Sequence, residues 1–171
     1  MADIKMTQIS DTHWGYYTNG LVRWYRRLQD AYRPKKVLDY DYADDVSNIF
    51  FIYCYHLKDW LRNDDSIKIK SKDIEAFVSS STPLSICGDL ANGRKHLALS
   101  GLRSKAKNLK AHPAINMTFS VGSKSNSKTS YTKTIEVDDR SYDALELAEE
   151  CMKEWQSFLK ANELIKNDLI R

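Results

Sequence analysis

The stretch IFFIYCYHL at positions 49–57 decides how this chain folds, because it is apolar on nearly every side of a helix. The helical pattern around it extends over residues 42–63, where Asp44 and Asp45 suit the positive N-terminus of a helix. A surface helix shows one apolar stripe, whereas a helix that is apolar nearly all round has to be enclosed by other elements. We therefore predict a helical domain with residues 42–63 as its most buried helix.

Other segments of the chain also have helical periodicity. The predicted helices are residues 12–33, 72–80 and 82–99, and a last helix that begins near 139–141. Pro34 ends the first of them, since proline lacks the N–H that a helix interior needs. Thr82 is a good N-cap, and Pro83 suits the first helical position.

The periodicity changes from helical to alternating before the last helix. Residues 115–121 and 131–137 alternate apolar and polar side chains, as strands do, and the loop 122–130 between them has no apolar residue. The sequence thus predicts a mainly-α bundle with a small β-hairpin inserted at about 114–137. No long linker separates the elements, so we expect the 171 residues to form a single domain.

Composition places the chain among ordinary globular proteins, with 42% apolar and 29% charged residues. It has no run of about 18 apolar residues that could span a membrane. Residues 1–10 lack the apolar stretch of a secretory signal. We expect a cytoplasmic protein without a membrane partner.

The three cysteines, Cys54, Cys87 and Cys151, are far apart in the sequence and form no CxxC pair. Each lies among apolar residues in a helical pattern. This placement predicts buried free thiols, which suit a reducing cytosol.

The net charge is only +3, but it is unevenly distributed. From Leu90 to Ile135 there is no Asp or Glu and there are nine Lys or Arg, so the remainder carries 3 − 9 = −6. This asymmetry favours a polyanion as partner, or self-association of opposite faces; the alternative is a solvated basic face. The residues expected to contact such a polyanion are Arg94, Lys95, Arg103, Lys105, Lys107, Lys110, Lys124 and Lys128.

Polar residues on two predicted helices are the candidate catalytic groups. Asp89, Asn92 and His96 occupy positions i, i+3 and i+7 and project from one face of their helix. His56 and Asp59 lie one turn apart on the central helix. If the two helices pack antiparallel, these five groups converge, and a histidine beside a carboxylate can transfer protons near neutral pH.

Two other interpretations of these polar residues stay open. Polar side chains on bundle helices often form networks that only fix packing. A metal site would need a specific ligand pattern, and neither His56 with Asp59 nor Asp89 with His96 matches one such as HExxH. We predict no metal and no other cofactor.

Aromatic residues raise the question of base stacking, because nucleobases stack on Trp and Tyr rings. The four tryptophans, Trp14, Trp24, Trp60 and Trp155, fall at core spacing, and we expect them in the core. Tyr131, near the predicted hairpin tip, is the exception and the candidate for stacking.

The segment DLANGRKH at positions 89–96 resembles the HEPN superfamily of helical-bundle domains. The motif of that family is an Arg, commonly followed by a polar residue such as Asn, then three residues and a His, on the third long helix. Asn92 and His96 match the Asn-x-x-x-His half, whereas Ala91 stands at the Arg position. The resemblance covers about residues 42–99.

The resemblance implies a HEPN-like bundle of four to five helices that forms a homodimer. It also implies RNA cleavage without a metal, or RNA or nucleotide binding where the motif has decayed, as in toxin–antitoxin, phage-defence and CRISPR-associated systems. Because Ala91 replaces the Arg, the contact to the scissile phosphate has to come from elsewhere, and Arg94 or Lys95 can partly substitute.

Two hypotheses of function follow. In the first, the protein is an RNA-directed HEPN-like ribonuclease in which His96 is the general acid/base, Asn92 positions a phosphate and Asp89 orients His96. In the second, it is a non-catalytic adaptor whose basic hairpin face engages an acidic partner, and the polar stripe is a buried structural network.

Overall fold

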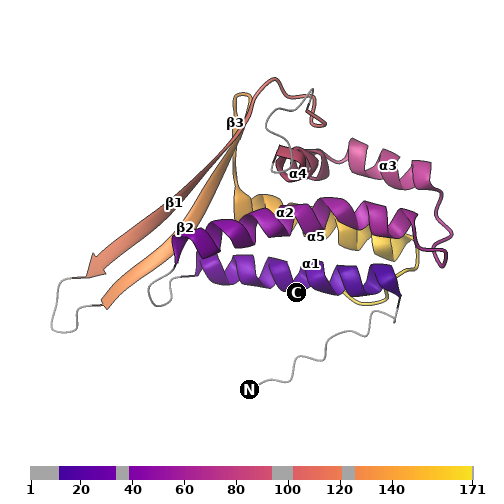
Figure 1. The fold of residues 1–171 in the computed structure, drawn as a ribbon, viewed down its shortest axis with the longest axis horizontal. Coiled ribbons are helices and arrows are strands. Elements are labelled where there is room, and N and C mark those ends of the chain that lie inside the picture. Colours follow the sequence, from indigo (N-terminus) through magenta and orange to yellow (C-terminus); the bar gives the residue numbers. More distant parts are fainter. Residues whose placement is uncertain (1–11, 34–38, 94–101, 121–125, 171) are drawn as a thin grey trace, which may run out of the picture.

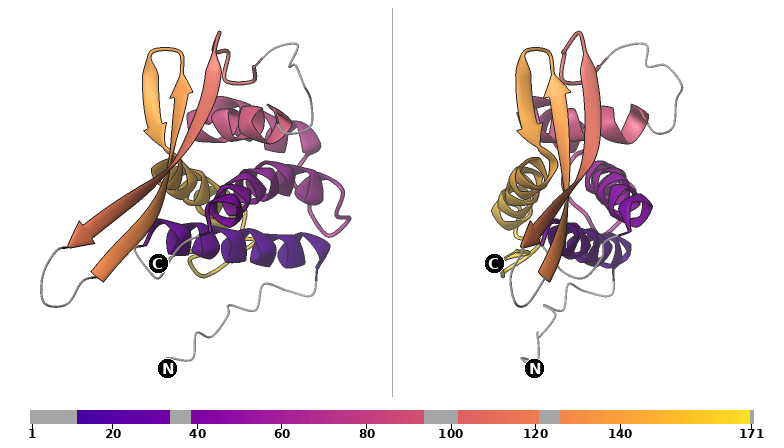
Figure 2. Two further views of the ribbon diagram at one scale, coloured as in Figure 1. Left: turned by 60° about the vertical axis from the view of Figure 1, so that its left-hand side comes forward. Right: turned by 90° about the vertical axis from the view of Figure 1, so that its left-hand side faces the viewer.

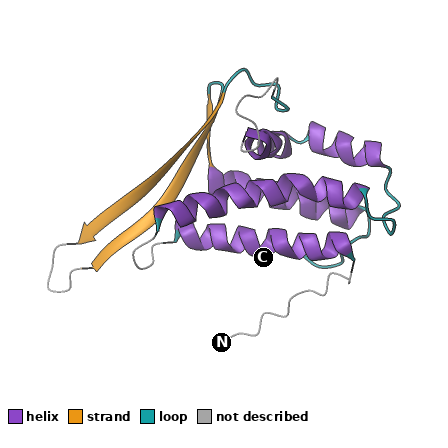
Figure 3. Ribbon diagram, in the orientation of Figure 1, coloured by secondary structure: helices purple, strands orange, loops and turns teal. Residues whose placement is uncertain are grey.

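The computed structural model describes residues 12–33, 39–93, 102–120 and 126–170, and of 115–120 and 126–130 only the backbone. Within these residues the fold is mainly α, as predicted, with a small three-stranded antiparallel sheet before the last helix (Figure 1, Figure 3). The helices are α1 (His13–Tyr32), α2 (Tyr40–Arg62), α3 (Ser71–Ser80), α4 (Thr82–Gly93) and α5 (Ala144–Ala161), and the strands are β1 (Leu109–Ser120), β2 (Asn126–Val137) and β3 (Arg140–Asp143).

Helix α2 is the central element that its sequence predicts. Phe50 and Leu57 are fully buried, and α1, α3, α4 and α5 all contact the helix. It begins two residues before the predicted start, because the Asp39 carboxylate accepts a hydrogen bond from the Tyr42 N–H and caps the helix.

The other helices of the first half lie close to their predicted ranges. α1 and α3 agree with prediction to within a residue at each end. α4 is capped one residue earlier than predicted, since the Ser81 hydroxyl accepts from the Leu84 N–H at 3.4 Å. The predicted end of this helix, near Leu99, lies outside the described residues.

The predicted hairpin is confirmed, but its strands are longer than the alternating pattern. β1 and β2 pair antiparallel along their whole length, with Ile115 opposite Tyr131. Residues 126–130, predicted to be loop, belong to β2. An antiparallel ladder bonds backbone to backbone, so a polar stretch can extend it without an apolar face.

Strand β3 was not predicted, and its four residues RSYD show no alternation that would indicate a strand. It pairs antiparallel with β2, with Arg140 opposite Val137. The predicted start of the last helix at 139–141 is therefore wrong. α5 begins at Ala144, where the Asp143 carboxylate accepts from the N–H groups of the first turn.

Among the described helices, α4 runs in a different direction from α1, α2 and α5. α2 lies across the view of Figure 1 beside α1 and α5, whereas α4 is seen end-on. In the right-hand view of Figure 2, turned by 90°, α4 lies across the view and α2 is foreshortened. α4 thus crosses α2. The β1–β2 hairpin leaves the bundle as an arm near the N-terminal end of α2 (Figure 1, Figure 2).

The base of this arm is fixed to the bundle by Lys133 of β2, which is 2% exposed. Its Nζ lies 3.0 Å from Asp44 Oδ1 and 2.7 Å from Asn48 Oδ1, both on α2. The Tyr131 hydroxyl donates to the same Asp44 carboxylate at 3.0 Å. Burial would raise the pKa of Asp44, but the hydrogen bond and positive charge of Lys133 outweigh it and lower this pKa.

Tyr131 is fully buried and packs edge-on against Tyr32. The prediction that its ring is a platform for nucleobases is therefore wrong. The ring fills the space between α1, α2 and the sheet, where its hydroxyl has a partner in Asp44. No described helix is long and apolar enough to cross a membrane.

We expect Lys133→Met to lower the free energy of unfolding by about 3 kcal/mol, because the variant removes the buried cation that pairs with the mostly buried Asp44 carboxylate. Urea unfolding followed by circular dichroism at pH 7 measures the change. Lys153→Met is the matched control, since Lys153 is exposed and pairs with Glu149 inside α5; it should change stability by less than about 0.5 kcal/mol. Equal effects of the two substitutions would refute the anchoring role of Lys133.

Candidate functional site

Charged side chains gather where α2, α3 and the segment after α4 meet. We call this group the α2–α3 cluster, and its members are His56, Lys58, Asp59, Arg62, Glu75 and Arg103. It contains three of the residues that the sequence singled out: the two candidate catalytic groups of the central helix and one expected phosphate contact.

His56 and Asp59 form the pair that their spacing predicts. His56 Nδ1 lies 2.8 Å from Asp59 Oδ2, one helical turn along α2. Both side chains are partly exposed, 23% for His56 and 37% for Asp59, so a ligand can reach them. A carboxylate on one ring nitrogen fixes the orientation of the imidazole and favours proton transfer at the other.

Lys58 lies between two carboxylates from different helices. Its Nζ is 2.6 Å from Glu75 Oε1 on α3 and 3.2 Å from Asp59 Oδ1, and the residue is only 5% exposed. Burial would lower the pKa of Lys58, but the hydrogen bond to Glu75 raises it, so the ammonium stays charged. Glu75 is not among the residues predicted from the sequence, although a lysine inside a nearly all-apolar helix indicates that a carboxylate must approach it.

Two arginines complete the cluster around Glu75. Arg62 Nη1 lies 2.7 Å from Glu75 Oε1, and Arg103 Nη2 lies 3.3 Å from Glu75 Oε2. The Arg103 guanidinium also lies over the Tyr55 ring, 5.3 Å from its centroid. Gly88 permits this packing, because a Cβ at that position would be 2.8 Å from the Tyr55 ring and 3.2 Å from Arg103.

Asp89 is 1% exposed and holds the turn from which Arg103 projects. Its carboxylate accepts hydrogen bonds from the Arg103 N–H at 2.5 Å, the Ser104 N–H at 2.9 Å and the Ser104 hydroxyl at 2.5 Å. Sequence analysis expected Asp89 to orient His96, which lies outside the described residues. The contacts that the structure does describe give Asp89 a structural role.

The expected convergence of α2 and α4 depended on antiparallel packing, and the two helices cross instead (Figure 1). Among the described residues, no hydrogen bond joins Asp89 or Asn92 to His56 or Asp59. The two helices are connected through the Asp89 turn, Arg103 and Glu75. Asn92 itself is partly exposed on α4.

Ala91 stands where the resemblance to HEPN domains would place an arginine, and this position faces the interior of the protein. Ala91 is fully buried in the core between the helices. An arginine here would bring an unpaired charge into apolar surroundings, which costs free energy. The small side chain at position 91 is therefore required by the packing of this bundle.

The expected RNA-contacting residues fall into four groups. Arg103 is paired with Glu75, whereas Lys105 and Lys107, between α4 and β1, and Lys110, at the start of β1, are exposed. Lys128 belongs to β2 opposite Thr118. Arg94, Lys95 and Lys124 lie outside the described residues.

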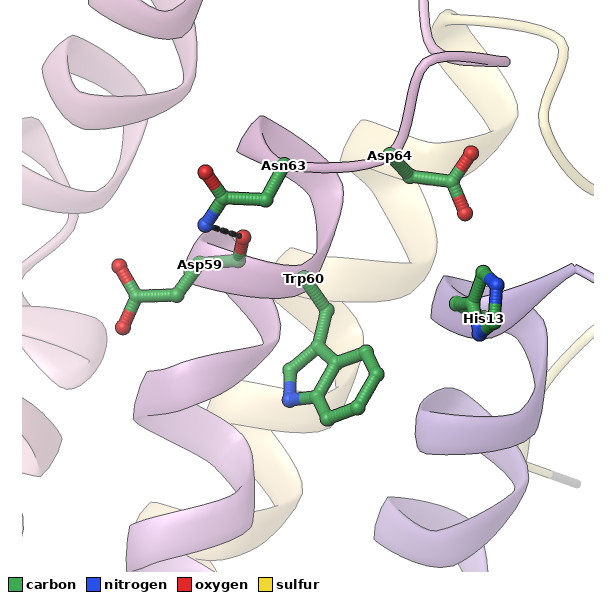
Figure 4. Close-up of a pocket in the computed structure, with 5 residues that line it drawn as sticks. All are labelled: His13, Asp59, Trp60, Asn63 and Asp64. Carbon is green, nitrogen blue, oxygen red and sulfur yellow. Dashed lines mark hydrogen bonds between the residues drawn. The ribbon is translucent and has the colours of Figure 1, made fainter.

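A hollow of about 300 Å³ adjoins the cluster at the C-terminal end of α2 (Figure 4). Its lining residues are His13, Asp59, Trp60, Asn63 and Asp64. Asp59 therefore contributes both to the α2–α3 cluster and to this hollow. The Asn63 side-chain amide donates to the Asp59 carbonyl oxygen at 2.8 Å and closes the end of the helix.

Trp60, expected in the core, is 39% exposed. Its ring stacks on Tyr17 of α1 at 4.8 Å, and Tyr17 stacks on Tyr53 at 4.7 Å. Trp14 and Trp155 are buried as predicted. An aromatic ring at the edge of the hollow offers a surface on which a base could stack.

The electrostatics of the α2–α3 cluster suit an anion. Three cations, Lys58, Arg62 and Arg103, face two carboxylates, Asp59 and Glu75. Burial would raise the pKa of both carboxyls, but hydrogen bonds lower it, from His56 and Lys58 to Asp59 and from Lys58 to Glu75. Both carboxylates are thus ionised at neutral pH, and among the described members of the cluster the cations exceed the carboxylates by one.

No protein-family model, no curated protein and no solved structure matches this chain. Geometry and chemistry are therefore the basis on which the site is assigned.

We expect the free energy of unfolding to fall as the pH is lowered from about 5 to 3, because Asp59 and Glu75 have lowered pKa values in the folded protein. The unfolded chain takes up protons near its ordinary pKa values, 3.8 for Asp and 4.5 for Glu, while the folded carboxylates remain charged. Their stabilisation is thus present above these values and lost below them. Urea unfolding at several pH values measures this. Between pH 5 and 3 the free energy of unfolding should fall less steeply in Glu75→Gln than in the wild type, and as steeply as in the wild type in the exposed Glu150→Gln.

Asp89→Ala should destabilise the protein by about 2–3 kcal/mol, since it removes a charged acceptor and leaves the N–H groups of Arg103 and Ser104 without their partner. Thermal unfolding measures this loss. Asp65→Ala, at an exposed position, is the control, and we expect it to stay within about 0.5 kcal/mol of the wild type. A wild-type Tm for Asp89→Ala would contradict the structural role.

Proposed function

We propose that this protein is an RNA-directed, HEPN-like domain that cleaves phosphodiester bonds without a metal. The observation that supports this proposal best is the partly exposed His56–Asp59 pair, 2.8 Å apart, beside a cluster with excess positive charge. A histidine fixed by a carboxylate transfers a proton, and nearby cations stabilise the charge that develops on a phosphate.

In this proposal two histidines share the proton transfers. His56, oriented by Asp59, acts from α2, and His96 acts as the second general acid/base, as the resemblance to HEPN domains implies. Asn92, partly exposed on α4, positions the phosphate. Asp89 contributes indirectly, since it fixes the turn that carries Arg103 into the cluster.

Affinity for RNA comes in this proposal from charges that carry no sequence information. The exposed Lys105 and Lys107 lie on the segment that joins α4 to the hairpin, and the exposed Lys110 lies at the start of β1. Contacts between lysines and phosphates release counterions, so binding should weaken steeply with salt. A homodimer in the cytoplasm, within a toxin or phage-defence system, is the setting that the HEPN resemblance implies.

A ribonuclease assay with purified protein in EDTA tests the proposal. We expect cleavage by the wild type, and a loss of about 10²–10⁴-fold in His56→Ala and in His96→Ala, the range that general acid–base catalysis contributes. His112→Ala is the matched control, because His112 is exposed on β1 beside Glu136, away from the cluster, and should retain full activity.

Cleavage that survives both His56→Ala and His96→Ala would overturn the catalytic roles. Circular dichroism of each variant shows whether the fold is retained, which separates a lost catalytic group from a lost structure.

The second candidate function is a non-catalytic adaptor that binds an acidic partner. The observation that favours it is that the Asp89 carboxylate accepts hydrogen bonds from the backbone of Arg103 and Ser104, as expected of a residue in a structural network. The two functions differ in their response to RNA. An adaptor for a protein predicts no salt-dependent affinity for unrelated RNAs, whereas the first proposal requires it.

A further inference from the structure

The three cysteines of the chain, which are far apart in the sequence, meet at one point in the fold. Cys54 comes from α2, Cys87 from α4 and Cys151 from α5, and their sulfur atoms all lie within 4.8 Å of one another. None of the three is accessible to solvent. The group, which we call the cysteine triad, therefore uses every cysteine that the sequence contains.

Contacts between the helices determine where each sulfur lies. Cys87 Sγ is 3.3 Å from the Phe51 carbonyl oxygen of α2, and Cys151 Sγ is 3.4 Å from the Pro83 carbonyl oxygen of α4. The Trp155 indole N–H donates to the Cys54 carbonyl oxygen at 3.0 Å. Each cysteine is thus held next to a helix that carries another member of the triad.

The spacing of the sulfurs is close to what a metal ion needs. With metal–sulfur bonds of about 2.3 Å, sulfurs arranged around one ion are separated by about 3.8–4.0 Å. The triad would have to contract by less than about 1 Å, which small rotations of the cysteine side chains provide.

The surroundings limit which ion fits. Structural zinc is almost always four-coordinate, and the described residues place no His, Asp or Glu ligand with the three sulfurs. The triad lies in the apolar core, and the two residues that bond to its members, Phe51 and Trp155, are almost fully and fully buried. Soft sulfur ligands select soft ions, among them Cu(I). A site with three sulfurs and no further ligand suits an ion that accepts low coordination.

We propose that Cys54, Cys87 and Cys151 form a closed three-sulfur site for a soft, thiophilic metal ion, of which Cu(I) fits best. The site is independent of the α2–α3 cluster and of any ribonuclease activity. It joins α2, α4 and α5, so an ion bound there stabilises the folded bundle, because the unfolded chain does not hold the three sulfurs together.

Binding has to displace protons from the thiols. Burial raises the pKa of Cys87 and Cys151 well above the ordinary range. Burial would also raise the pKa of Cys54, but hydrogen bonds from the neighbouring cysteines and Trp155 lower it. Each Cu–S bond that forms on a thiolate replaces an S–H bond, and the proton passes to the solvent. Affinity should therefore increase with pH.

The test uses the full chain, reduced and handled without oxygen, and refolded from guanidinium with Cu(I) supplied by a competing chelator. We expect one Cu(I) per chain, with ultraviolet thiolate-to-copper absorption. At free Cu(I) about one hundred times Kd, the Tm should rise by roughly 5–10 °C. X-ray absorption of the wild-type complex should show sulfur neighbours and no nitrogen or oxygen, a readout that needs no variant.

Cys151→Ala and Cys87→Ala are the ligand variants, and Ser47→Ala is the control, since Ser47 is buried on α2 but lies outside the triad. Each ligand variant should lose at least about 100-fold in affinity, because loss of an outer-shell partner alone costs 10–100-fold. The control should bind as the wild type does. Wild-type protein that binds no Cu(I), folded cysteine variants that bind it equally well, or tighter binding of Zn(II) than of Cu(I) would each overturn the proposal.

Discussion

The constraint on which the structure depends is that the middle of α2 is apolar on nearly every side and has to be covered from several directions. Phe50 and Tyr55, which lie about 140° apart around this helix, are both buried. The other helices have to cover it, α1 and α5 lengthwise and α4 across it (Figure 2). Enclosing one apolar helix from several directions removes more apolar surface from water than packing amphipathic helices in pairs.

The few polar groups of α2 then determine what packs at its two ends. Near the N-terminus of α2, Asp44 forms an ion pair with Lys133 of β2. Near its C-terminus, Lys58 forms an ion pair with Glu75 of α3. A charge removed from water is tolerated only with a partner, so each of these residues requires a particular neighbour. The hairpin and α3 are therefore positioned by electrostatic pairing as well as by apolar contact.

The pairing of buried charges also explains why the candidate site lies where α2, α3 and the segment after α4 meet. Asp89 is buried on α4, and its carboxylate fixes the backbone of Arg103, whose guanidinium joins Lys58 and Arg62 around Glu75. A structural contact on one helix thus supplies a cation to a cluster on another. His56 and Asp59 are the part of this arrangement that remains partly exposed to solvent.

The sequence by itself determined the helices, the hairpin and the His56–Asp59 pair, because these depend on periodicity and on residues one turn apart. It did not determine β3, whose residues lack alternation, nor the partners Glu75 and Ser104, nor the burial of Tyr131. Only the tertiary structure decided that α4 crosses α2 and that three distant cysteines meet. Contacts between elements depend on crossing angles and on burial from several sides at once, and local periodicity contains neither.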